Sequence, residues 1–105
     1  MIQVIFTVKD NDICGFEISG HSDYAEEGSD IVCAAVSSAA LMAANTITEV
    51  QSLQADITEN DGFLSLNLSQ GDAKTAEVIL NGLLLHLNAL SKAYSEFINV
   101  KITEV

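Results

Sequence analysis

The alternation of apolar and polar residues most constrains what this chain can fold into. Apolar side chains take every second position over residues 2–8, 13–19, 63–69 and 97–103, and this spacing predicts strands. Residues 13–19 follow a short polar segment after residues 2–8, so the two form a hairpin. The segment 55–59 forms a second hairpin with 63–69, because "ENDG" between them carries the Asp-Gly signal of a tight type I′ turn.

The alternation stops twice, and each time a helical spacing replaces it. Residues 31 to about 53 form the first predicted helix, whose first half is rich in alanine and serine, so another element can approach it closely. Residues 72 to about 95 form the second, with Asp72 as a candidate cap after Gly71. Its apolar face comprises Ala76, Ile79, Leu83, Leu87, Leu90 and Tyr94.

The resulting ββαββαβ order predicts an α+β fold. Each strand has one apolar face, so we expect a two-layer sandwich with both helices packed on one face of a mostly antiparallel sheet. Residues 1–105 are predicted to form a single domain, and 49% hydrophobic residues are enough for a core without metals or disulfides.

The amino-acid composition indicates which kinds of partner the protein can bind and in which cell compartment it is expected. Fifteen acidic residues face only four lysines, for a net charge of −11, which disfavours direct binding to nucleic acid and favours a basic partner. We expect no apolar run as long as the roughly 18 residues of a membrane helix and no leader before the first strand. We therefore expect a cytoplasmic protein whose two cysteines are reduced and which does not enter a membrane.

Cys33 is a candidate nucleophile because of its place at the start of a helix. Asp30 is a good N-cap residue, so Cys33 falls near the third helical position, where backbone N–H groups and the helix dipole stabilise a thiolate. A cysteine nucleophile needs a base within hydrogen-bond reach. The loop 20–29 is long enough to bring His21 to this helix start, and Asp30 would either orient His21 or cap the helix.

Other interpretations of these residues stay open on the sequence alone. Cys33 could be a packed core residue, and His21 a surface residue. His86 is a rival base, but its position beside the apolar stripe favours packing. Cys14 lies among apolar residues and is expected to be structural. Ser37, one turn after Cys33, either lines the site or bonds back to a helix carbonyl.

The segment "GHSDYAEEGSDIVCAAVSS" resembles the motif of the ribosomal-processing cysteine proteases. The motif is a Gly-His pair, an acidic loop and then Asp-[Ile/Leu]-Val-Cys-Ala-Ala-Val-Ser. The resemblance implies that His21 and Cys33 are catalytic and that Asp30 supports them. It matches Gly20 and Ser37 as well, and departs from the family at Ser22, where alanine is common.

This resemblance implies a cysteine endopeptidase that removes the N-terminal extension of a large-subunit ribosomal protein, with no cofactor and no metal. It also implies a homodimer and a loop between His21 and Cys33 that orders around substrate. Backbone N–H groups near Cys33 would form the oxyanion hole. The alternative is a non-enzymatic ribosome-assembly factor that binds a basic ribosomal protein. A third class, a redox sensor using Cys14 and Cys33, has no support in the sequence.

A ridge on the second helix is a candidate dimer contact. Val78, Gly82, Leu85 and Ala89 recur at helical spacing away from the apolar stripe. A large apolar residue beside small ones suits a symmetric contact between two copies. The other interpretation is a helix covered by its own neighbours.

Overall fold

The predicted ββαββαβ order is confirmed by the computed structural model, which describes residues 1–22, 25 and 30–105. In chain order the elements are β1 (Ile2–Lys9), β2 (Asp12–Ser19), α1 (Ile31–Asn45), the π-helix η1 (Thr46–Val50), β3 (Asp56–Asn60), β4 (Phe63–Asn67), α2 (Gln70–Thr75), α3 (Glu77–Ala93) and β5 (Ile98–Glu104).

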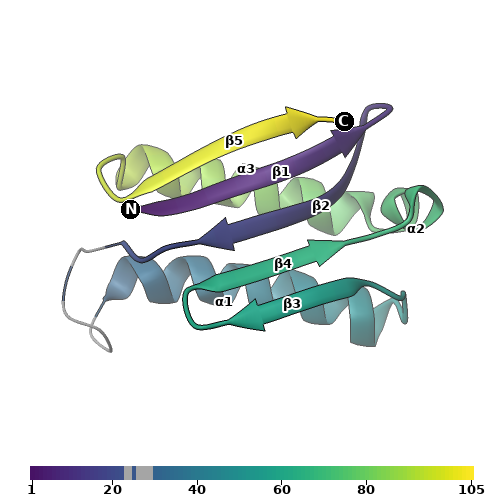
Figure 1. Cartoon of the computed structure of the whole chain (residues 1–105), viewed down its shortest axis with the longest axis horizontal. Coiled ribbons are helices and arrows are strands. Elements are labelled where there is room, and N and C mark those ends of the chain that lie inside the picture. Colours follow the sequence, from purple (N-terminus) through teal and green to yellow (C-terminus); the bar gives the residue numbers. More distant parts are fainter. Residues whose placement is uncertain (23–24, 26–29) are drawn as a thin grey trace.

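Within the described residues the strands form one sheet in the order β3-β4-β2-β1-β5. Neighbours pair antiparallel except β1 and β5, which are parallel. Figure 1 shows α1 and α3 side by side behind the same face of the sheet. The predicted two-layer α+β sandwich is therefore confirmed.

The core lies between the sheet and these two helices. From the strands, Val4, Phe6, Phe16 and Leu66 are almost fully buried, and the rings of Phe6 and Phe16 are 6.0 Å apart across β1 and β2. The helices contribute Val32, Val36, Ala40, Ala43, Ala44, Leu80, Leu83 and Leu87. The three buried alanines of α1 have little side chain, which fits the close approach expected from the sequence.

A β-bulge changes which residue of β2 faces the core. Thr7 pairs with Gly15 and Val8 with Ile13, so Cys14 is the extra residue between them. Ile13 is consequently buried in the core. Simple alternation over residues 13–19 would place Cys14 on the same face as Phe16, and the bulge makes this prediction wrong. The Cys14 thiol, half-buried, donates to the carbonyl of Thr7 over 3.5 Å.

Both helices differ in detail from their predicted ranges. The first ends as η1 at Val50, short of residue 53. The second is interrupted at Ala76, whose φ of −91° and ψ of 6° end α2 and precede α3. The break lets α2 lie beside the β1–β2 turn, where Lys74 pairs with Asp12 at 3.1 Å. Ser69, not Asp72, caps α2, because its side chain accepts from the Asp72 N–H.

The helical segment Ile31–Val50 corrects the expectation that no segment reaches the length of a membrane helix. Its 20 residues have a hydropathy of 1.7, which is apolar enough to cross a membrane by length and composition alone. Figure 1 shows that this segment lies against the sheet, where Val32, Val36 and Ile47 are buried. Core packing accounts for part of its apolar composition, because 39% of the segment is buried while Ile31, Met42 and Val50 are exposed.

The start of α1 is held by the predicted cap. Asp30 has an extended backbone, and its Oδ1 accepts from the N–H groups of Val32 at 3.1 Å and Cys33 at 3.0 Å. Its Oδ2 accepts from the hydroxyl of Ser22, which is buried. One carboxylate therefore fixes both the first turn of α1 and the residue next to His21.

We predict that Asp30→Ala lowers the free energy of unfolding by about 1–2 kcal/mol, the usual cost of losing an N-cap. Asp30→Asn is the matched control, because asparagine caps about as well and keeps an acceptor for the helix N–H groups. Urea unfolding followed by circular dichroism measures both. An unchanged midpoint in Asp30→Ala would show that the cap does not stabilise the fold.

Candidate active site

Gly20 turns the chain out of the sheet immediately after β2. Its φ is +90°, and a Cβ at this position would lie 2.5 Å from the carbonyl oxygen of Met1. Both facts favour glycine, because other residues rarely adopt this φ and none can place a carbon so close to backbone. The N–H of Gly20 donates to the carbonyl of Gly62 over 2.9 Å. The bend therefore has a defined direction, and His21 follows it.

The side chain of His21 lies against the turn between β3 and β4. A Cβ at Gly62 would be 2.9 Å from Nε2 and 3.3 Å from Cε1 of this imidazole. The residue as a whole is exposed, so the ring rests on the turn with another part open to solvent. His21 therefore follows the end of β2 in the chain and contacts the β3–β4 turn through its side chain.

Cys33 is the third residue of α1, as predicted. It is half-buried and packs against the core. Its N–H and that of Val32 donate to Asp30, and the N–H of Ala34 donates to the Asp30 carbonyl over 3.1 Å. The suggestion that N–H groups near Cys33 form an oxyanion hole is therefore wrong for these three donors, because helix capping already occupies them.

A pocket of about 250 Å³ brings four of the five predicted site residues together. Gly20, His21, Cys33 and Ser37 all line it, although they come from the β2 end and from two turns of α1. Ser37 is exposed there, and its hydroxyl makes no hydrogen bond within the described part of the chain, which argues against a bond back to a helix carbonyl. Asp30 does not line the pocket. It supports the site indirectly, because it caps the helix that carries Cys33.

The β3–β4 hairpin supplies the wall that sequence reasoning missed. Residues 59–64 line the pocket opposite α1, and Ile2, Ile18, Val36, Ala40 and Leu41 complete it. The Asp-Gly signal at 61–62 identified the turn, and Gly62 has a positive φ of +70°. The predicted type I′ conformation is wrong, because Asp61 lacks the positive φ that this type requires at both central residues. No local signal showed that this turn would lie beside His21, because that depends on how β4 pairs with β2.

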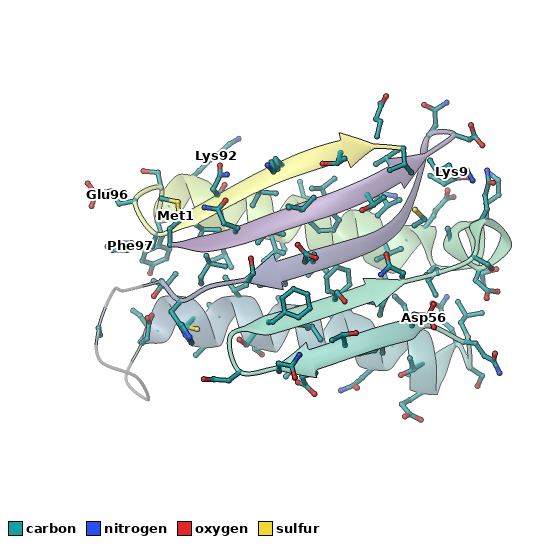
Figure 2. The ribbon with its side chains drawn as sticks, in the orientation of Figure 1. Met1, Lys9, Asp56, Lys92, Glu96 and Phe97 are labelled. Carbon is teal, nitrogen blue, oxygen red and sulfur yellow. The ribbon has the colours of Figure 1, made fainter. Side chains whose placement is uncertain are left out.

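The charged residues that line the pocket are acidic, apart from His21. Glu59 and Asp61 contribute from the hairpin, and no lysine is among the described lining residues. Figure 2 shows Lys9 at the far end of β1 and Lys92 above α3 and β5, away from the β3–β4 turn. The acids Asp23, Glu26 and Glu27 of the predicted substrate-ordering loop lie outside the described residues.

The alternative candidates for the base and the thiol, His86 and Cys14, do not line this pocket. His86 is exposed on α3 and is not among the pocket residues, so the packing role expected for it is wrong. Cys14 is also outside the pocket, at the bulge. Among residues 1–22, 25 and 30–105, no group of three or more His, Cys, Asp or Glu side chains is arranged to hold a metal ion.

The family model and the similar known proteins point to the same protein family. Residues 1–99 match the family model described as cysteine protease Prp. The ribosomal processing cysteine protease Prp of Staphylococcus aureus is 31% identical over 103 residues, covering 95% of this chain and 97% of that protein. The Bacillus subtilis protein of the same name is 27% identical over 100 residues, covering 90% of this chain and 88% of its own length.

Solved structures agree with this result. The essential ribosomal processing protease Prp of S. aureus, in complex with a covalently linked product peptide, superposes with a TM-score of 0.90 at 30% identity, over 98% of this chain and 100% of that one. Its complex with a substrate peptide gives a TM-score of 0.85 at 29% identity, with the same coverage. The fold, the pocket and these matches together show that the chain belongs to the cysteine protease Prp family.

Proposed function

We propose that this protein is a cysteine endopeptidase that removes the N-terminal extension of a large-subunit ribosomal protein during ribosome assembly. The observation that carries the proposal is that Cys33 and His21, which come from different elements, line one pocket. The family membership of the chain supports the same chemistry. The cytoplasmic location stays a prediction.

The proposed reaction follows from a thiol and an imidazole at one pocket. His21 takes the proton of the Cys33 thiol, and the sulfur attacks the scissile carbonyl to form a tetrahedral oxyanion. Collapse of this intermediate breaks the C–N bond, and His21 returns the proton to the leaving amine. Water, deprotonated by His21, then hydrolyses the thioester and restores the thiol. The product peptide covalently linked to the S. aureus relative fits a mechanism with a covalent intermediate.

The other predicted site residues support this pair in different ways. Asp30 fixes the start of α1 and, through Ser22, the residue after His21, so we assign it a positioning role rather than direct contact with the imidazole. Ser37 offers a free hydroxyl inside the pocket for a polar group of the substrate. Gly20 permits the bend that directs His21 into the pocket.

We predict that Cys33→Ala abolishes peptide cleavage and that His21→Ala lowers kcat/KM by about 10²–10⁴-fold, the usual contribution of a general base. His86→Ala is the matched control, since His86 is exposed on α3 outside the pocket, and it should cut normally. The assay follows cleavage of a peptide that spans the extension and the first residues of the mature ribosomal protein.

The same assay separates the enzyme from a non-enzymatic assembly factor. A binding protein would leave the peptide intact in the wild type and would bind it equally well with either substitution. Normal cleavage by His21→Ala together with loss in His86→Ala would show that His86 is the base.

The acidic pocket wall supports a basic substrate. Ribosomal proteins are basic because they bind rRNA, and Glu59 and Asp61 attract cationic side chains at the entrance to Cys33 and His21. Exposed charges act over about 8 Å at 0.15 M ionic strength, so their effect lies mainly in association.

We predict that kcat/KM for a basic extension peptide falls as salt rises and that Glu59→Gln with Asp61→Asn weakens this dependence. Asp56→Asn is the control on the same strand, because Asp56 lies at the other end of β3 (Figure 2) and outside this pocket. Initial rates at several NaCl concentrations test it. A salt dependence that is the same in the double variant as in the wild type would exclude these two carboxylates.

A homodimer is part of the proposal, with the α3 ridge as its contact. Val78 and Leu85 are 83% and 74% exposed, and the small residues Gly82 and Ala89 between and beside them are exposed as well. The ridge therefore faces away from the sheet, as the helical spacing predicted. A second copy of this ridge would cover two large apolar side chains.

We predict that Leu85→Lys gives monomers in sedimentation velocity, because a buried unpaired charge opposes association. Val50→Lys is the matched control, since Val50 is 78% exposed on η1 and lies outside the ridge. A dimer that persists in Leu85→Lys would move the contact elsewhere, to a sheet edge.

A further inference from the structure

We propose that Gly62 is a positioning residue for His21: the bare backbone of the β3–β4 turn is the surface on which the catalytic imidazole rests. This inference rests on the proposed function, in which His21 is the base. It adds a residue that lies outside the 20–38 segment, and the three nearest atoms to a Cβ built there all belong to His21.

The contact involves one continuous edge of the ring. A Cβ at Gly62 would meet Nε2 at 2.9 Å, Cε1 at 3.3 Å and Cδ2 at 3.6 Å of His21. Real Cβ atoms essentially never lie within 3.0 Å of a neighbouring heavy atom, so a side chain at Gly62 requires the imidazole or the turn to shift. The atom displaced most is Nε2, one of the two nitrogens that can exchange a proton with the thiol or the substrate.

The backbone on both sides of His21 is held, so the ring has to absorb the displacement. On one side the N–H of Gly20 is bonded to the carbonyl of Gly62 itself, which continues the β2–β4 ladder beyond the Ser19–Phe63 pair. On the other side Ser22 is 1% exposed and donates to Asp30. The His21 backbone therefore has little freedom to move away from the turn.

The backbone conformation of the turn does not by itself require glycine. Gly62 has a φ of +70°, and Asn11 adopts the nearly identical φ of 69° in the β1–β2 turn. Asparagine tolerates this region and is common in such turns. The feature that distinguishes the two positions is the neighbour: His21 lies on Gly62, whereas Asn11 is exposed. Figure 1 shows that the β1–β2 turn and the β3–β4 turn lie at opposite ends of the sheet.

The experiment compares Gly62→Asn and Gly62→Ala with Asn11→Ala. Gly62→Asn keeps a residue suited to positive φ and adds the Cβ, so it tests the contact without the full backbone strain. Gly62→Ala and Asn11→Ala place alanine at almost the same φ in two hairpin turns, so Asn11→Ala reports the effect of positive-φ strain at a turn without the His21 contact. Only the Gly62 variants should affect His21.

Two readouts separate positioning from folding. The first is kcat and KM on the extension peptide: we expect kcat to fall about 10- to 100-fold in both Gly62 variants with a smaller change in KM, because a misplaced catalytic group costs about this much. The second is the imidazole ¹H–¹³C spectrum, in which the His21 signals should shift while those of His86 stay as an internal reference. Asn11→Ala should change neither.

Wild-type kcat and unshifted His21 signals in Gly62→Asn would overturn the inference, and so would equal effects in Asn11→Ala. Failure of the proposed function gives a different result. If the wild type cleaves no peptide, or if His21→Ala cleaves normally, the catalytic assignment falls, while the His21 signals of the Gly62 variants still report whether the turn positions the ring.

Discussion

The antiparallel pairing of β2 with β4 is the constraint on which the site depends. Ser19 lies opposite Phe63, and the next bond of the ladder joins the N–H of Gly20 to the carbonyl of Gly62. The register is strongly specified, because a shift by one residue would turn Leu64 and Leu66 away from the core. Core packing thus determines that the β3–β4 turn lies beside His21 and closes one wall of the pocket.

The start of α1 is the second support, and it explains how one carboxylate serves both halves of the site. Asp30 accepts from the first N–H groups of the helix that carries Cys33 and from Ser22, the neighbour of His21. The link between the loop and the cap runs through Ser22, the position at which this sequence departs from the motif that it resembles. Asp30 also caps the helix directly. The N–H groups of Val32 and Cys33 donate to its carboxylate, so they are not available to the oxyanion that they were expected to bind.

Most elements could be predicted because their signals are local. Side-chain alternation located the strands, the Asp-Gly turn located the second hairpin, and Asp30 located the beginning of α1 to the residue. The failures have non-local causes. Cys14 left the core face because β1 and β2 meet through a bulge, and the second helix broke at Ala76 because α2 packs beside the β1–β2 turn, where Lys74 reaches Asp12.

By itself, the sequence determined the α+β class and the order of the elements, and its resemblance to a protease motif selected Gly20, His21, Cys33 and Ser37, which share a pocket. A capped helix start, a glycine bend and a polar loop are properties of neighbouring residues, so they can be recognised without the fold. Only the tertiary structure decided what surrounds them: Glu59, Asp61 and Gly62 join His21 although some 40 residues separate them. The physical reason is that strand pairing and core packing act across the whole chain, and no local pattern carries the position of a partner strand.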